Sequence, residues 1–128
     1  MLVLRLAIAC GVFLSAGTAC GFLSRDPAPA PSPREGEVAV EVENHNWSDI
    51  TVYLMTGGLP QRLGMVTALS NGSFAFSSQR LSTGGSVQLR ANPVAGNSFT
   101  SEAILVQPGQ AIMWRLENDL DISSLSVY

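Results

Sequence analysis

Residues 37–56 read EVAVEVENHNWSDITVYLMT and contain two segments in which apolar and polar side chains alternate. The apolar residues that share one side of these segments are Val38, Val40 and Val42, then Ile50, Val52 and Leu54. Successive side chains of a β-strand point to opposite faces, so a period of two indicates a strand with one buried face. Between the segments, the polar run from Asn44 to Asn46 indicates a turn. This stretch therefore predicts two consecutive strands and an all-β fold.

The same alternation continues to the C-terminus. Further strands are expected at 63–65, 74–76, 87–91, 103–106, 112–117 and 122–127. They are separated by the turn residues Gly57-Gly58, Asn71-Gly72, Gly84-Gly85, Asn92-Pro93 with Gly96-Asn97, and Pro108-Gly109. We expect one helical turn at 77–81. Short strands with a turn about every ten residues predict an antiparallel β-sandwich of seven or eight strands over residues 37–128.

Large aromatic side chains and one internal similarity add detail to this domain. The four aromatic residues expected to fill its core are Trp47, Phe74, Phe76 and Trp114. Residues 42–53 and 116–128 resemble each other, because both read as a strand, a polar corner and a second strand. Two copies are too few for a repeat array, so the similarity predicts two alike corners of one sandwich.

The N-terminus has the pattern of an export signal. Residues 1–19 read MLVLRLAIACGVFLSAGTA, with Arg5 near the start, an apolar stretch at 6–14 and small residues at 15–19. These are the n-region, the h-region and the cleavage site of a signal peptide, which we expect to form a helix.

A cysteine follows this cleavage site directly. Gly17-Thr18-Ala19-Cys20 resembles the lipobox of a bacterial lipoprotein signal, with a glycine where that family usually has an aliphatic residue. The resemblance implies lipidation of Cys20 and attachment to a membrane. Cys10, the other cysteine, lies inside the signal, so no disulfide is expected in the mature chain. Plain secretion and an uncleaved membrane anchor remain as alternatives.

A proline-rich linker is expected at 20–36, between the lipid anchor and the β-domain. Its segment 25–36 reads RDPAPAPSPREG. Proline alternating with alanine or serine favours an extended polyproline-II spacer, which would hold the domain about 20–40 Å from the bilayer. A PxxP ligand for an aromatic groove is the alternative.

Three segments of the domain carry a resemblance to known proteins. They are RLGMV at 62–66, FAF at 74–76 and VQPGQAIMW at 106–114. Together they resemble the immunoglobulin-like or transthyretin-like accessory domains of exported bacterial proteins, including small bacterial lipoproteins. The resemblance implies a β-sandwich and carries no activity with it.

The charge of the chain excludes one class of function. Seven basic residues, all arginine, stand against ten acidic ones, and the isoelectric point is about 4.9. The arginines are single and far apart in the sequence, and no basic cluster is visible. A protein of this charge repels phosphate backbones, so we expect no nucleic-acid partner.

His45 is the only histidine and therefore the only candidate base for a serine hydrolase, with Asp49 close by in the sequence. The chain has no G-x-S-x-G elbow, so a histidine in a polar turn is the simpler interpretation. A zinc site needs three or four ligands, and the domain offers one histidine and no internal cysteine.

The acidic corner at 117–123, ENDLDIS, places oxygen ligands at alternate positions, as calcium-binding loops do. Asn44, Asn46 or Asp49 could complete such a site. The spacing does not fit an EF-hand, and a solvated turn is the alternative.

From these observations we expect a non-catalytic lipoprotein of the bacterial cell envelope, facing the periplasm or the outer membrane. It would be held to the membrane through Cys20, with no catalytic, cofactor-binding or metal-binding residue. Its β-sandwich would contact an envelope protein through edge strands or loops such as 92–98. The alternatives are a module that binds a small ligand or Ca²⁺, and a hydrolase that uses His45.

Overall fold

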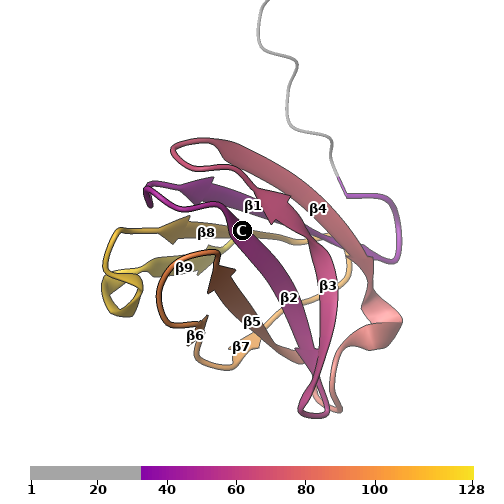
Figure 1. The fold of residues 1–128 in the computed structure, drawn as a ribbon. Coiled ribbons are helices and arrows are strands. Elements are labelled where there is room, and N and C mark those ends of the chain that lie inside the picture. Colours follow the sequence, from indigo (N-terminus) through magenta and orange to yellow (C-terminus); the bar gives the residue numbers. More distant parts are fainter. Residues whose placement is uncertain (1–32) are drawn as a thin grey trace, which may run out of the picture.

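The structure, a computed structural model, describes residues 33–128 (Figure 1). The expected signal at 1–19, Cys20 and the linker up to residue 32 lie outside the described residues. Across 33–128 no helix combines the length and apolar character needed to cross a bilayer. The described strands are β1 (Glu37–Asn44), β2 (Ile50–Thr56), β3 (Leu59–Val66), β4 (Asn71–Ser77), β5 (Ser86–Pro93), β6 (Phe99–Thr100), β7 (Ile104–Leu105), β8 (Ala111–Leu116) and β9 (Ser124–Val127). The predicted all-β fold is confirmed, with nine strands in this part of the chain in place of seven or eight.

The first sheet has the strand order β4-β1-β8-β9. β1 pairs antiparallel with β4, and β8 pairs antiparallel with β9. β1 and β8 are parallel, with Val40 opposite Ile112 and Asn44 opposite Leu116. The prediction of purely antiparallel sheets is therefore wrong at this pair. A parallel pair needs a long crossover, and the strands β2 to β7 between β1 and β8 supply it.

The second sheet has the order β3-β2-β5-β6, and β7 also pairs with β5. Its pairs are all antiparallel. The register between β2 and β3 shifts by one residue, since Val52 lies opposite Gly64 and Tyr53 lies opposite Arg62. Leu63 is the extra residue of this β-bulge, and it packs against the core while Met65 is exposed. Without the bulge, Leu63 and Met65 would point to the same face of the strand.

One hydrophobic core lies between the two sheets, filled by the residues that the alternation placed on the inner faces. Val38, Val40 and Val42 of β1 meet Ile50, Val52 and Leu54 of β2, all at most 1% exposed. Trp114 is fully buried and Phe76 nearly so, as predicted, and Phe74 packs partly buried against them. Burial of apolar area is the main stabilising contribution in such a domain.

Two glycines pack closely against the core. A Cβ atom on Gly64 would overlap the ring of Phe74, and one on Gly72 would lie 2.7 Å from Cγ2 of Val66. Gly72 belongs to β4, so the predicted turn at Asn71-Gly72 is wrong. The chain turns at 67–70 instead, where Leu69 has a positive φ of 53° and the hydroxyl of Ser70 donates to the carbonyl of Thr67 at 2.8 Å. Gly72 serves close packing between strands.

Trp47 does not fill the core, contrary to the prediction, and 75% of it is exposed. It lies in the loop after β1, where the alternation of the strand no longer applies. The helical turn expected at 77–81 is present as the 3₁₀-helix η1 (Ser78–Arg80).

Candidate functional site

The loops that follow β1 and β8 lie at the same edge of the first sheet, on the left of Figure 1. Parallel neighbours end at the same side of a sheet, and Asn44 at the end of β1 is opposite Leu116 at the end of β8. The two polar corners that resemble each other in sequence are thus side by side. We call residues 44–49 and 117–123 together the paired corner.

Asn44 anchors the paired corner to the second sheet. It is 1% exposed, and its Nδ2 donates to the carbonyls of Ser48 at 3.0 Å, Val66 at 3.3 Å and Thr67 at 3.0 Å. Its Oδ1 accepts from the backbone N–H of Asn46 at 2.9 Å. A buried amide with every polar atom bonded holds a loop in a single conformation.

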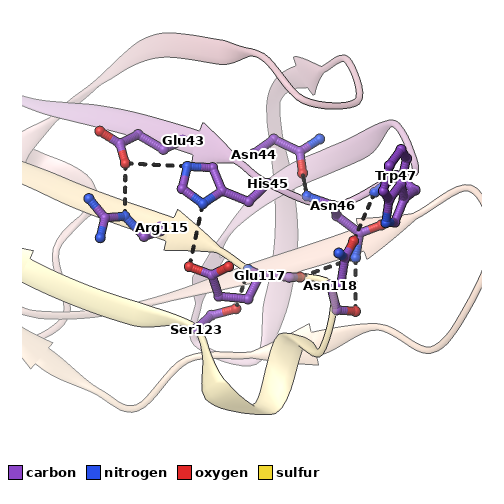
Figure 2. Close-up of polar contacts among 9 residues, drawn as sticks. All are labelled: Glu43, Asn44, His45, Asn46, Trp47, Arg115, Glu117, Asn118 and Ser123. Atoms are coloured by element: carbon purple, nitrogen blue, oxygen red, sulfur yellow. Dashed lines mark hydrogen bonds and ion pairs between the residues drawn. The ribbon is translucent and has the colours of Figure 1, made fainter.

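Asn46 and Asn118 join the two halves of the paired corner (Figure 2). Nδ2 of Asn46 donates to the carbonyls of Glu117 and Asn118, both at 3.1 Å. In return, Oδ1 of Asn118 accepts from the backbone N–H of Trp47 at 3.1 Å. The backbone of Trp47 is therefore fixed from both sides.

The indole of Trp47 consequently stands in solvent on a backbone that cannot easily move. Figure 2 shows it at the opposite end of the view from the charged side chains of the site. An exposed tryptophan leaves a large apolar surface in water, and tryptophan is enriched among the residues that dominate binding energy at interfaces. A tryptophan on a fixed backbone is suited to recognition, because only its side chain loses conformational freedom when a partner covers it.

A charged cluster lies beside the paired corner on the outer face of the first sheet. His45 faces two carboxylates, with its Nδ1 3.5 Å from Oε1 of Glu117 and its Nε2 3.8 Å from Oε2 of Glu43. Arg115 donates from Nε to the same Glu43 oxygen at 2.9 Å. Glu43 and Arg115 thus form an ion pair, and His45 lies between the carboxylates of Glu43 and Glu117.

The arrangement around His45 does not match the geometry of a hydrolase. Both ring nitrogens face carboxylates, and across the described residues no serine hydroxyl forms a hydrogen bond with His45. Asp49, the expected acid, accepts from the backbone N–H of Ala68 at 2.9 Å instead. The structure brings His45 to Glu117, which is distant in sequence, and directs Asp49 to the turn after β3.

A shallow pocket of about 230 Å³ lies between the paired corner and the loop that follows β5. On the side of the paired corner, the pocket is lined by Asn118, Asp119 and Asp121. On the opposite side, it is lined by the segment 93–99, apart from residue 94. The loop 92–98, chosen from sequence as a contact loop, therefore does border the candidate site.

The residues proposed as calcium ligands are dispersed. Asn44 and Asp49 bind the turn after β3, and only Asn46 reaches the acidic corner, where it donates hydrogen bonds. Oδ1 of Asp119 accepts from the N–H of Asp121 at 3.1 Å and so caps the 3₁₀-helix η2 (Leu120–Ile122). Residues 33–128 contain no cluster of three or more His, Cys, Asp or Glu that could hold a metal ion.

Sequence reasoning missed two features of the site. It placed Trp47 in the core, and it gave Asn118 no structural role beyond a turn. The spacing Asn44-x-Asn46-Trp47 is the local signal for Trp47, since side-chain amides two residues apart form successive Asx turns that end a strand. The contact between Asn118 and Trp47 has no local signal.

Comparison with known proteins leaves the function to the geometry of the site. Neither a protein-family model nor a curated protein matches this chain. The resemblance to immunoglobulin-like or transthyretin-like lipoproteins stays a prediction from the sequence. Trp47 and the loops around it are therefore the features of the described residues that bear on function.

Proposed function

We propose that this chain is a lipid-anchored protein of the bacterial cell envelope whose β-domain is a non-catalytic module that binds another exported protein. The observation that carries the proposal is the exposed side chain of Trp47 on the hydrogen-bonded backbone of the paired corner. The binding surface would consist of Trp47 at its centre, the paired corner around it and the loop 93–98 at its side.

The chemistry of this surface defines the partner. Trp47 requires a pocket lined by apolar or aromatic side chains. Beside it, Asp119 and Asp121 of the paired corner give the surface an acidic side. A partner with basic residues around an apolar pocket would be complementary, and such a rim mainly raises the rate of association.

The N-terminus supports attachment to the envelope. In this proposal the helix of the signal at 1–19 is removed, Cys20 is acylated, and the segment 20–36 spaces an immunoglobulin-like or transthyretin-like sandwich from the membrane. The lipobox resemblance at 17–20 supports the anchor, and the prolines of 25–36 support an extended spacer.

The anchor is tested separately from the binding surface. Cys20→Ala, or treatment with the signal-peptidase inhibitor globomycin, is expected to leave a larger, unprocessed form. The Cys20→Ala form should carry no labelled acyl chain, because the thiol that would be acylated is gone. Normal processing of the Cys20→Ala variant would contradict the anchor while leaving the role of Trp47 open.

The binding surface is tested by site-specific crosslinking in intact cells. A photoreactive phenylalanine at position 47 is expected to crosslink one envelope protein, which is then identified and purified. Trp47→Ala should weaken binding of the full-length chain to that protein by about 30-fold, corresponding to about 2 kcal/mol.

Leu59→Ala is the matched control, because Leu59 is 74% exposed and lies at the other end of β2, after the turn at Gly57-Gly58. Its affinity should equal that of the unmodified chain. Equal losses for Trp47→Ala and Leu59→Ala, or no loss for either, would contradict the proposal.

A small-ligand module is the second candidate, and the pocket beside the paired corner favours it. The pocket is small and polar, and Asp119 and Asp121 give it an acidic side. Calorimetric titration of the full-length chain with Ca²⁺ tests this function. Heat of binding that Asp121→Asn abolishes would support it, whereas the absence of heat would exclude Ca²⁺ as the ligand of this pocket.

A further inference from the structure

The second sheet carries a row of three side chains that the sequence gives no reason to group. Tyr53 of β2 lies directly opposite Arg62 of β3 on one side and Arg90 of β5 on the other. Val52 and Leu54 are fully buried, so Tyr53 points away from the core, and its two cross-strand partners point the same way. Two arginines that are single in the sequence thus flank one tyrosine on the outer face.

The β-bulge at Leu63 creates this row. With regular pairing, Leu63 would lie opposite Tyr53 and Arg62 would face the other way. Because the bulge shifts the register by one residue, Leu63 packs on the core and Arg62 takes the outward position. β-bulges often re-aim a side chain beside a functional site.

The face around this row has no acidic strand residue. Its outward positions on β2, β3, β5 and β6 are Thr51, Tyr53, Met55, Pro60, Arg62, Met65, Gln88, Arg90, Asn92 and Thr100. Across residues 33–128 the only arginine in an ion pair is Arg115, on the other sheet. In an acidic protein, positive charge that no carboxylate of these strands offsets is available to an external anion.

The row also has a preformed shape. Nη2 of Arg90 donates to the hydroxyl of Ser98 at 2.8 Å, which restrains the guanidinium group. A shallow pocket of about 240 Å³ is lined by Tyr53, Pro60, Arg90 and Asn92, with Arg62 across Tyr53 from Arg90. One guanidinium group, a phenol and a carboxamide thus border the pocket, and the second guanidinium group belongs to the cross-strand neighbour of Tyr53 on β3.

We infer that the Arg62–Tyr53–Arg90 row is a binding site for a phosphate group carried by a small organic molecule. Phosphate presents several strong acceptor oxygens and about two negative charges. It can therefore accept hydrogen bonds from more donors at once than a carboxylate can. The tyrosine ring offers a surface for the organic part of the ligand. The pocket has the volume for one headgroup-sized ligand, and a nucleic acid would need a longer positive surface.

The test uses the full-length chain in a non-ionic detergent, titrated with inorganic phosphate at constant ionic strength and followed by calorimetry and by the chemical shifts of arginine Nε. We expect saturable binding, with shifts at Arg62 and Arg90. Arg62→Gln and Arg90→Gln should each weaken binding about tenfold, which corresponds to about 1.4 kcal/mol. Arg90→Lys should recover only part of the loss, because an ammonium group lacks the planar fork of donors.

Arg80→Gln is the matched control, since Arg80 is an exposed arginine of η1 outside the row and its loss changes the net charge equally. It should bind phosphate as the unmodified chain does. Absence of saturable binding, or an equal loss for Arg80→Gln and Arg90→Gln, would overturn the inference.

The same titration separates two sources of the phosphate. Glycerol phosphate and dihexanoyl phosphatidic acid, the latter below its micelle concentration, both carry a phosphate monoester on glycerol but differ in acyl chains. Tighter binding of the lipid would assign the site to membrane headgroups, and equal affinities would assign it to a soluble phosphate ester. Either result supports the phosphate site, and neither depends on the role proposed for Trp47.

Discussion

The outer faces of the two sheets use charge in opposite ways. On the first sheet, Glu43 is paired with Arg115, and His45 lies between Glu43 and Glu117. On the second sheet, Arg62 and Arg90 flank Tyr53 with no acidic strand residue beside them. The difference shows that strand order decides charge pairing, because β1 and β8 bring opposite charges together while β2, β3 and β5 bring like charges together.

The largest effect is expected from removing the Asn44 side chain, which forms hydrogen bonds between the two sheets. Asn44 ends β1 of the first sheet and donates to the carbonyl of Val66 on β3 of the second. Asn44→Ala would remove these bonds and leave buried backbone groups without partners, so we expect about 3 kcal/mol of destabilisation. Urea unfolding of the full-length chain in detergent measures this loss.

A loss below about 0.5 kcal/mol for Asn44→Ala would show that Asn44 does not hold the sheets together, since surface substitutions have effects of that size. Asn71→Ala is the control, because Asn71 is an exposed asparagine at the start of β4 in the same sheet.

The next effect should combine a loss of stability with a loss of binding on the arginine face. A Cβ at Gly64, beside the bulge, would overlap the ring of Phe74, so Gly64→Ala must displace that ring or β3. We expect about 2 kcal/mol of destabilisation. Phosphate affinity should fall as well, because the bulge positions Arg62. Thermal unfolding and the phosphate titration measure the two losses.

The exposed Gly58→Ala variant does not serve as a control for Gly64→Ala, since Gly58 has a φ of 79° that an alanine adopts only with strain. Ser73→Ala, on the outer face of β4, is the suitable one. Unchanged stability of Gly64→Ala would mean that the bulge region is soft and that the arginine row is not preformed.

A smaller effect is expected on the acidic face. Glu43→Gln removes the carboxylate that both Arg115 and His45 face, and exposed ion pairs of this kind contribute up to about 1 kcal/mol. The loss should shrink in 0.5 M salt, because screening weakens the pair in the unmodified chain. Chemical unfolding at low and high salt measures this, and phosphate binding on the other sheet should be unchanged.

The smallest effect concerns the C-terminal residue. The hydroxyl of Tyr128 donates to Oε2 of Glu41 at 2.8 Å, and this hydrogen bond, with minor contributions from desolvation and from the charge of Glu41, raises the pKa of Tyr128 above 10. A raised pKa in the folded state means that the stabilisation is complete below pH 10 and is lost as the pH rises through the higher value.

The comparison with Tyr128→Phe isolates this bond. The variant should be less stable by about 0.5 kcal/mol at pH 8, and the difference should shrink as the pH rises above 10. A difference that stays constant with pH would show that the ring of Tyr128, and not its hydroxyl, supplies the stabilisation.

The alternation of apolar residues predicted most of the fold. It located β1, β2, β5 and β8 and the side chains that each sends inward, because period-two burial is a local property of an extended chain. It gave no strand direction, so the parallel pair of β1 and β8 was missed. Glycine was taken as a turn signal at Gly72, where its function is to let Val66 approach.

The candidate site was predictable only in part. The two alike corners and the loop 92–98 were identified from the sequence, and the structure brings all three together. Trp47 was placed in the core because its size favours burial, whereas the Asn44 and Asn46 turns direct it outward. The partners of the paired corner, such as Asn46 with Asn118, are distant in sequence and leave no local pattern.

By itself, the order of amino acids determined which segments are extended and which side of each meets the core, since apolar burial acts residue by residue. Only the tertiary structure decided that β1 and β8 run side by side and that Arg62, Tyr53 and Arg90 form one row. Strand order and register are set by the free energy of the whole core. The bulge at Leu63 is part of that register, and the local sequence pattern does not predict it.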